Sequence, residues 1–123
     1  MFRLKRQKAY ELGKTGEERA LAYFKKAKYK IIKKSFRLHR GEIDIIAYDR
    51  KTLVFVEVKT RRKETFGLPE EAVTPAKQQK IRRLAEAFLA LNGFRDIECR
   101  FDVLSLTEQE DGNYLICHIK NAF

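Results

Sequence analysis

The chain has 123 residues, of which 44% are hydrophobic and 11% aromatic, enough for one packed domain and too apolar for intrinsic disorder. Lys and Arg outnumber Asp and Glu by 27 to 17, which gives a formal net charge of +10 and a pI of about 9.8. Such an excess favours a polyanionic partner, most simply nucleic acid, over a merely basic soluble protein or a partner of an acidic protein.

Membrane, secretion and zinc-site signals are missing from the sequence. No apolar run approaches the roughly 20 residues of a membrane span, and the basic N-terminus lacks the apolar segment of a signal peptide. Cys99 and Cys117 show neither paired-cysteine spacing nor clustered His, so we interpret both as buried or inert strand residues. We therefore expect a cytoplasmic protein with no membrane partner.

Hydrophobic periodicity and turn residues divide the chain into a basic N-terminal arm, two helices and five strands. The arm spans residues 1–8. Apolar spacing predicts a helix from about Tyr10 to Ala27, and Thr74 with Pro75 starts a second helix that ends near Leu91. Alternating or β-branched runs predict strands over Tyr29–Leu38, Gly41–Tyr48, Thr52–Thr60, Arg100–Leu106 and Asn113–Ile119.

This order, α-β-β-β-α-β-β, predicts a single mixed α/β domain over residues 1–123. The run Leu53-Val54-Phe55-Val56 is apolar on both faces of its strand, which indicates helices on both sides of the sheet. The apolar stripe of the first helix is predicted to contain Gly13, Glu17, Ala20, Leu21, Phe24 and Ala27. That of the second contains Ile81, Leu84, Ala85, Phe88 and Leu91.

Charged residues inside the two central strands need a physical reason. Side chains alternate along a strand, so Glu57 and Lys59 point to one face, and Glu42, Asp44 and Ile46 share a face of the neighbouring strand. If the strands pair as a hairpin, Asp44 and the Glu57–Lys59 pair converge near one edge of the sheet. Buried charge is costly unless it is paired or bound to a metal.

Glu17 is the third acid of interest, because it lies on the predicted core-facing stripe of the first helix. One explanation is an acid near the helix N-terminus that the helix dipole favours. The other is that Glu17 joins Asp44 and Glu57 in one site.

Carboxylates that converge beside an ammonium group suit metal-assisted phosphodiester hydrolysis. Mg²⁺ prefers hard oxygen ligands and keeps several waters, so two carboxylates and a backbone carbonyl suffice. The simpler alternative is an ion-pair cluster of Asp44, Glu57 and Lys59 with a structural role.

Basic residues follow the acid pair directly. Arg61, Arg62 and Lys63 are placed to grip a phosphate backbone, although a solvated charge run is the alternative. His39, in the turn before Gly41, is interpreted as a loop residue or phosphate contact, because no second His or Cys lies near it.

Three motifs together resemble the PD-(D/E)xK nuclease superfamily. They are GxxGExxA at Gly13–Ala20, GEIDIIA at Gly41–Ala47 and FVEVKTR at Phe55–Arg61. More narrowly, the chain resembles the YraN-like family of small bacterial proteins, related to archaeal Holliday junction resolvases. The resemblance extends through Lys77, RFDV at Arg100–Val103 and HIKNAF at His118–Phe123, and so covers nearly the whole chain.

The resemblance implies a restriction-endonuclease-like core, with a central mixed five-stranded sheet flanked by helices, and a Mg²⁺- or Mn²⁺-dependent endonuclease. Asp44, Glu57 and the backbone carbonyl of Val58 match the metal ligands. Lys59 matches the catalytic lysine, and Glu17 the helical acid that completes such sites. Lys77 and Arg40 join Arg61, Arg62 and Lys63 as expected nucleic-acid contacts.

DNA, in branched or junction form, is the expected substrate, and a homodimer is expected because symmetric cuts need two sites. The alternative is a non-catalytic nucleic-acid-binding protein on a nuclease-like scaffold, and a third is a structural partner of an acidic protein. The converging acids argue against a pure binding groove, because without a cation they repel phosphate.

Overall fold

A computed structural model describes residues 9–62 and 73–123 of the chain. The expected basic arm at residues 1–8 and the expected nucleic-acid contact Lys63 lie outside the described residues. The elements are, in chain order, helix α2 (Ala9–Lys26), strands β1 (Lys30–Leu38), β2 (Gly41–Asp49) and β3 (Thr52–Arg61), helix α3 (Pro75–Leu91), and strands β4 (Cys99–Glu108) and β5 (Tyr114–Ile119). This confirms the predicted order of elements.

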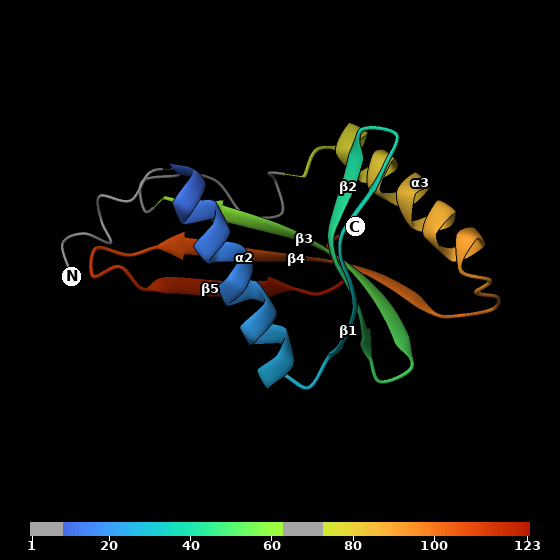
Figure 1. Ribbon diagram of the computed structural model, residues 1–123, viewed down its shortest axis with the longest axis horizontal. Helices are drawn as coiled ribbons and strands as arrows, with labels where there is room; N and C mark the ends of the chain where they lie inside the picture. The colour runs from blue at the N-terminus through green and yellow to red at the C-terminus, as the bar shows by residue number, and fades with distance from the viewer. Residues whose placement is uncertain (1–8, 63–72) are drawn as a thin grey trace.

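The five strands form one mixed sheet in the order β1-β2-β3-β4-β5. All neighbours pair antiparallel except β3 and β4, which run parallel because α3 lies between them in the chain. In Figure 1 the β1–β2 hairpin runs steeply across the direction of β3, β4 and β5. The sheet is therefore strongly bent between β2 and β3.

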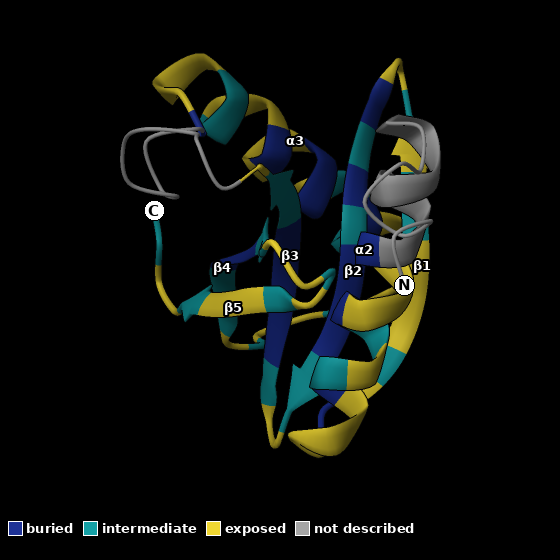
Figure 2. Ribbon diagram, turned by 90° about the vertical axis from the view of Figure 1, so that its left-hand side faces the viewer, coloured by how far each residue is buried: buried dark blue, intermediate teal, exposed yellow. Residues whose placement is uncertain are grey.

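Helices cover both faces of the sheet, as the apolar run in β3 predicted. Helix α2 packs against β1, β3 and β4, and α3 packs against β2. The buried apolar side chains form two separate hydrophobic clusters. One lies around Phe24 and Val56 beneath α2, and the other lies around Phe55 and Phe88 beneath α3. Figure 2 shows β2 and β3 buried along most of their length, while the outer surfaces of both helices are exposed.

The bend lies at the start of β2. Strand β2 pairs with β3 only from Ile45, opposite Val56, to Asp49, opposite Thr52. Ile43 and Ile46 both pack in the cluster beneath α3, whereas Ile45 packs in the cluster beneath α2. Strict alternation, which predicted one face for Glu42, Asp44 and Ile46, is therefore wrong here, because the strand turns where it leaves β3.

Helix α2 buries a narrower stripe than its sequence predicted. Ala20 and Phe24 are buried, together with Gly16, but Glu17 and Ala27 are exposed. The helix can approach the sheet because Gly16 has no side chain: a Cβ atom at this position would collide with Oγ1 of Thr60. Glu17 is therefore not part of the buried stripe, because Gly16 occupies the line of closest approach, and it borders a cavity beneath the helix instead.

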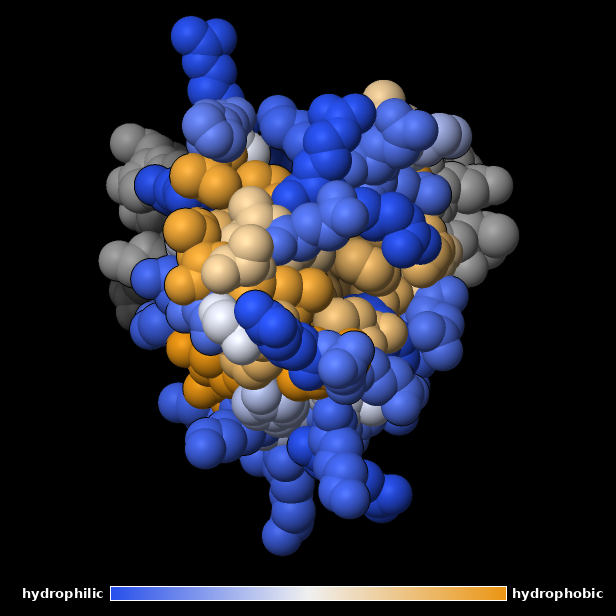
Figure 3. Space-filling view, turned by 90° about the vertical axis from the view of Figure 1, so that its right-hand side faces the viewer, coloured by the Kyte–Doolittle hydropathy of each residue, from blue (hydrophilic) through white to orange (hydrophobic). Residues whose placement is uncertain are grey.

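Helix α3 begins as predicted at Pro75, with the Thr74 hydroxyl accepting a hydrogen bond from the Lys77 N–H. Its buried residues are Ile81, Leu84, Ala85 and Phe88. Leu91, predicted on the same stripe, is instead 69% exposed because it lies in the last turn, past the edge of β2. Figure 3 shows apolar side chains gathered on the face at this end of the molecule, with hydrophilic ones around them.

A buried polar network ties β4 to the C-terminal residues. The fully buried carboxylate of Asp102 accepts hydrogen bonds from Arg100, from His118 Nε2 at 2.7 Å and from the backbone N–H of Asn121. Arg100 also donates to Asp49 and to the Tyr29 hydroxyl. These contacts account for the RFDV and HIKNAF segments as structural elements.

No helix in the described residues is long and apolar enough to cross a membrane.

Candidate active site at the fork of β2 and β3

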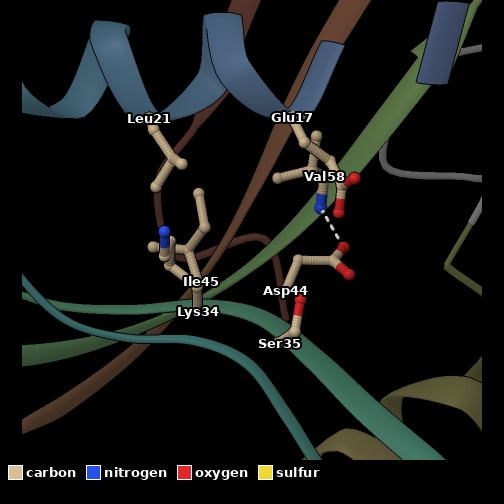
Figure 4. Close-up of a pocket in the computed structure, with 7 residues that line it drawn as sticks. All are labelled: Glu17, Leu21, Lys34, Ser35, Asp44, Ile45 and Val58. Carbon is tan, nitrogen blue, oxygen red and sulfur yellow. Dashed lines mark hydrogen bonds between the residues drawn. The ribbon is translucent and has the colours of Figure 1, made fainter. Parts of the chain in front are cut away.

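Strands β2 and β3 stop pairing beyond Ile45 and Val56, and the point where they separate is here called the fork. Asp44 lies at the fork, next to the last pair. Its Oδ2 accepts a hydrogen bond of 2.7 Å from the backbone N–H of Val58, across the opening between the strands. Figure 4 shows Asp44 beside Val58, with Glu17 and Leu21 extending from α2 above them. The convergence predicted near an edge of the sheet thus occurs in its interior, between the second and third of five strands.

The surroundings of Asp44 favour its neutral form. Burial, followed by the nearby charge of Glu57, raises the pKa of Asp44 to about 7, and Glu42 and Glu17 act in the same direction. The hydrogen bond from Val58 opposes this rise but does not cancel it. A cation bound next to this carboxylate would stabilise its charged form.

Glu57 lies in the same cavity as Asp44 and is 7% exposed. Its Oε2 receives two ammonium groups, Lys59 Nζ at 3.4 Å and Lys77 Nζ at 2.7 Å. Lys59 shares the strand face of Glu57, and Lys77 comes from the first turn of α3. The lysine expected to contact DNA is therefore held against a candidate metal ligand.

The two ammonium groups differ in their electrostatic surroundings. Burial and the neighbouring Lys77 lower the pKa of Lys59, and Glu57 only partly offsets them. Burial lowers the pKa of Lys77 as well, but contact with Glu57 outweighs it and leaves this pKa raised. Lys59 is thus the more easily deprotonated of the pair.

Asp44 lines two cavities, one on each side of the fork. The cavity beneath α2 has a volume of about 210 Å³ and is lined by Glu17, Leu21, Lys34, Ser35, Asp44, Ile45 and Val58. The cavity beside α3 has a volume of about 220 Å³ and includes Asp44, Glu57, Lys77, Lys80 and Arg40. Glu17 therefore approaches Asp44 from one side of the fork, and Glu57 from the other.

The donor set suits a hard divalent cation. Asp44 and Glu57 offer oxygen atoms in one cavity, and a cation there would relieve the repulsion that raises the pKa of Asp44. Within the described ranges no group of three or more His, Cys, Asp or Glu side chains is close enough to hold a metal. Two carboxylates remain sufficient for Mg²⁺, which keeps several water ligands.

The remaining predicted contacts flank the fork. Arg61 and Arg62 lie at the end of β3, two to three residues beyond Lys59. Arg40 lines the α3-side cavity, where the ammonium group of Lys80 donates to its backbone carbonyl. Lys80 is not among the contacts predicted from the sequence. Its three-residue spacing from Lys77, on the same side of α3, is the signal that could have placed it here.

Comparison with known proteins identifies the family. A family model described as "Uncharacterised protein family UPF0102" matches residues 16–106. The chain belongs to the UPF0102 family. A UPF0102 protein of Geobacter sulfurreducens is 49% identical over 112 residues, which are 91% of this chain and 88% of the relative. One from Caldicellulosiruptor saccharolyticus is 46% identical over 114 residues, covering 92% and 97% of the two chains.

This is the YraN-like family expected from the three motifs. The part matched to UPF0102 runs from Gly16 in α2 to Leu106 in β4. It therefore includes every described residue of the fork: Glu17, Asp44, Glu57, Lys59 and Lys77.

Proposed function

We propose that this protein is a metal-dependent endonuclease of the PD-(D/E)xK superfamily that hydrolyses phosphodiester bonds in DNA, with Mg²⁺ or Mn²⁺ as cofactor. One observation carries the proposal. Asp44 and Glu57, from adjacent strands, line one cavity, and the pKa of Asp44 is raised by burial and by Glu57. A site that only needed structural ion pairs would not place two acids against each other in a buried position.

Each side chain has a role that follows from its position. Asp44 and Glu57 would hold the cation, with the carbonyl of Val58 as a further ligand. A bound divalent cation polarises the phosphate and lowers the pKa of a coordinated water. Lys59, the lysine with the lowered pKa, would orient the attacking water or stabilise charge on the phosphate.

The charge of the molecule supports a DNA substrate. A net charge of +10 draws phosphates toward the protein regardless of sequence. Arg61 and Arg62 follow Glu57 and Lys59 along the chain, and Arg40 lines the α3-side cavity. For branched DNA, two symmetric cuts would require a homodimer, which sedimentation of the protein with and without a four-way junction tests.

Cleavage of a substrate panel tests the proposal. Linear, flapped and four-way DNA are incubated with Mg²⁺, with Mn²⁺ and with a chelator. We expect metal-dependent cleavage that Asp44→Asn, Glu57→Gln and Lys59→Ala each reduce by about 100-fold or more. Asp44→Asn should preserve the fold, because its amide oxygen can still accept from Val58.

Lys51→Ala is the matched control for Lys59→Ala, because Lys51 lies exposed in the turn between β2 and β3. The control should cleave like the natural protein. Absence of cleavage on every substrate with either metal would overturn the enzymatic proposal, as would full activity in Asp44→Asn.

The second candidate is a non-catalytic DNA-binding protein, and the pairing of Glu57 with two lysines favours it. In that case the acids are neutralised internally, and Mg²⁺ only weakens binding, because it competes with the protein for the phosphates. In the enzyme, Mg²⁺ strengthens DNA binding, and in metal-free buffer Asp44→Asn binds DNA more tightly than the natural protein. Titration of labelled DNA with and without Mg²⁺ separates the two, measured on Lys59→Ala, in which cleavage is expected to be reduced and both carboxylates remain.

A further inference from the structure

The turn between β1 and β2 has an unusual backbone. It consists of His39 and Arg40, with Leu38 paired to Gly41 across the hairpin. Both residues have positive φ, 49° and 63°, which is the conformation of a type I′ turn. Gly, Asn and Asp normally supply these positions, and other residues pay about 1 kcal/mol or more each.

The turn is held against α3. A Cβ atom at Gly41 would lie 2.7 Å from Leu84 Cδ1 and 3.1 Å from Lys80 Cε, so any larger residue here would displace the ends of these two side chains. Lys80 Nζ donates to the carbonyl of Arg40 at 3.3 Å. The strained turn is thereby fixed next to the exposed side of the helix.

Three adjoining hollows connect this turn to the candidate active site. The α3-side cavity of the fork shares Lys80 and Leu84 with a hollow of about 540 Å³, lined by Leu38, His39, Ala76, Gln79, Lys80, Arg83, Leu84 and Ala87. The α3-side cavity also shares Arg40, Gly41 and Glu42 with a third hollow of about 570 Å³. This third hollow is lined by Arg37, Leu38, His39, Arg40, Gly41 and Glu42. Because they share these lining residues, the three adjoining hollows are together called the turn–α3 groove.

The turn–α3 groove is strongly basic. Its lining carries Arg37, Arg40, Lys77, Lys80 and Arg83, and outside the fork its acid is Glu42, which is paired with Arg37 at 3.5 Å. Arg40 and Arg83 form no ion pair with an acid among residues 16–62 and 73–123. Positive charge is therefore available in the groove for an external anion.

We infer that the turn–α3 groove binds the sugar–phosphate backbone of a DNA duplex and leads it to the fork, with His39, Lys80 and Arg83 as contacts beyond those already assigned. The inference rests on the proposed nuclease function. From Lys77 to Arg83 the helix rises about 9 Å, at about 1.5 Å per residue. That length matches two or three nucleotides of one strand at about 3.4 Å each.

The lining favours a duplex over a single strand. Single-strand grooves combine basic residues with aromatic platforms on which bases stack. Among the described residues that line the groove there is no Phe or Tyr, and its floor is aliphatic, from Leu38, Leu84 and Ala87. Basic side chains without base platforms contact phosphates and read no sequence, so we expect binding that tolerates any duplex sequence.

Salt-dependent binding to labelled DNA tests this groove. Affinities are measured in chelator, which prevents cleavage, for a duplex and a single strand of the same sequence. For the double variant Lys80→Gln/Arg83→Gln we expect about tenfold weaker duplex binding and a slope of log affinity against log salt that is reduced by about 2, since each lost phosphate contact removes about 0.9. Arg83→Gln alone, which leaves the Lys80–Arg40 contact intact, should reduce the slope by about 1.

Lys25→Gln/Lys51→Gln is the control with the same change in net charge. Lys25 lies in the last turn of α2 and Lys51 in the β2–β3 turn, both exposed and at the opposite end of β2 from His39. The control should keep the natural slope. An unchanged slope in the groove variant, an equal loss in the control, or a greater loss for single-stranded than for duplex DNA would overturn the inference.

The cleavage panel separates this inference from the proposed function. Metal-dependent cleavage together with an unchanged slope in the groove variant rejects the groove and leaves the nuclease in place. Groove-dependent duplex binding by a protein that cleaves nothing rejects the nuclease and retains the groove as a DNA-binding surface.

Discussion

At the scale of single residues, Glu57 is stabilised by two lysines in a redundant way. The Oε2 atom of Glu57 contacts Lys59 and Lys77, and the carboxylate is 7% exposed. Either lysine alone keeps the buried carboxylate paired, so we expect Lys59→Ala or Lys77→Ala to lower the free energy of unfolding by about 1 kcal/mol or less. Removing both leaves a buried charge without a partner, and the loss should reach about 3 kcal/mol. Urea denaturation of the two single variants and the double variant measures this non-additivity.

Glu57→Gln in the double-variant background is the control for this prediction. It removes the unpaired charge and should recover much of the lost stability. If the two single losses simply add to the double loss, Glu57 does not depend on the lysines in this way.

Asp102 gives the protein a pH-dependent source of stability. Burial favours its neutral form, but the hydrogen bonds from His118 and Arg100 outweigh this and hold the pKa of Asp102 below its usual 3.8. The stabilisation is therefore fully present above the unfolded-chain pKa and is lost as pH falls through the lower folded value. Asp102→Asn should cost about 3 kcal/mol near neutral pH.

Denaturation curves of both proteins between about pH 5 and pH 2 measure this effect. The difference in free energy of unfolding should shrink as the pH falls, since the natural carboxylate becomes protonated. A difference that stays constant or grows toward low pH would show that Asp102 does not act as a paired carboxylate.

Residues that interact along one strand could be predicted from the sequence, and those brought together by packing could not. The Glu57–Lys59 pair follows from the two-residue strand period, and the structure has it at 3.4 Å. The contact of Lys77 with Glu57 depends on how α3 lies against β2, which no local pattern reports. Glu17 was placed on the core stripe because helical spacing does not tell which of two neighbouring residues, Gly16 or Glu17, meets the sheet.

At the scale of elements, Gly16 sets the distance between α2 and β3. Glycine inside a helix is normally less favourable than alanine by about 1 kcal/mol, so Gly→Ala usually stabilises. Here the added methyl group would collide with Oγ1 of Thr60. We expect Gly16→Ala to destabilise the protein by about 1–3 kcal/mol, because the helix must move away from the sheet. Thermal or urea denaturation shows the sign directly.

Thr60→Ala removes the colliding atom and supplies the matched test. In that background Gly16→Ala should become neutral or stabilising. A stabilising effect of Gly16→Ala in the natural sequence would mean that α2 does not depend on this close approach.

Element boundaries were predictable wherever the chemistry of the ends is local. Thr74 and Pro75 mark the start of α3 because a hydroxyl cap and a proline both suit a helix N-terminus. The bend of β2 could not be predicted from the sequence. It arises where β2 stops pairing with β3, and there Ile43 and Ile46 lie on the same face of the sheet although they are three residues apart. The candidate site forms at this point, where the pairing of β2 with β3 ends.

At the scale of the whole molecule, composition and element order indicated the fold class, whereas the arrangement of the strands needed the structure. The parallel pairing of β3 and β4 follows from the order of elements, because α3 connects them as a crossover helix. The bend between β2 and β3 does not follow from the order of elements. The fork exists because two parts of the sheet, the β1–β2 hairpin and β3–β4–β5, diverge (Figure 1). Their junction is held by backbone pairing up to Ile45 and by one side chain beyond it.

That side chain should be detectable in hydrogen exchange. The amide of Val58 lies beyond the last β2–β3 pair, Ile45 with Val56, and donates to Asp44 instead of to a strand. Asp44→Ala leaves this amide without a partner, which costs about 1–3 kcal/mol, so its exchange should accelerate about tenfold or more. The amide of Val54, paired within β2–β3 opposite Ala47, should accelerate only as far as global stability falls. Asp44→Asn, which keeps an acceptor oxygen, should protect Val58 nearly as well as the natural residue. Equal acceleration at Val54 and Val58 would mean that the two parts of the sheet separate as one unit and that Asp44 does not hold the fork.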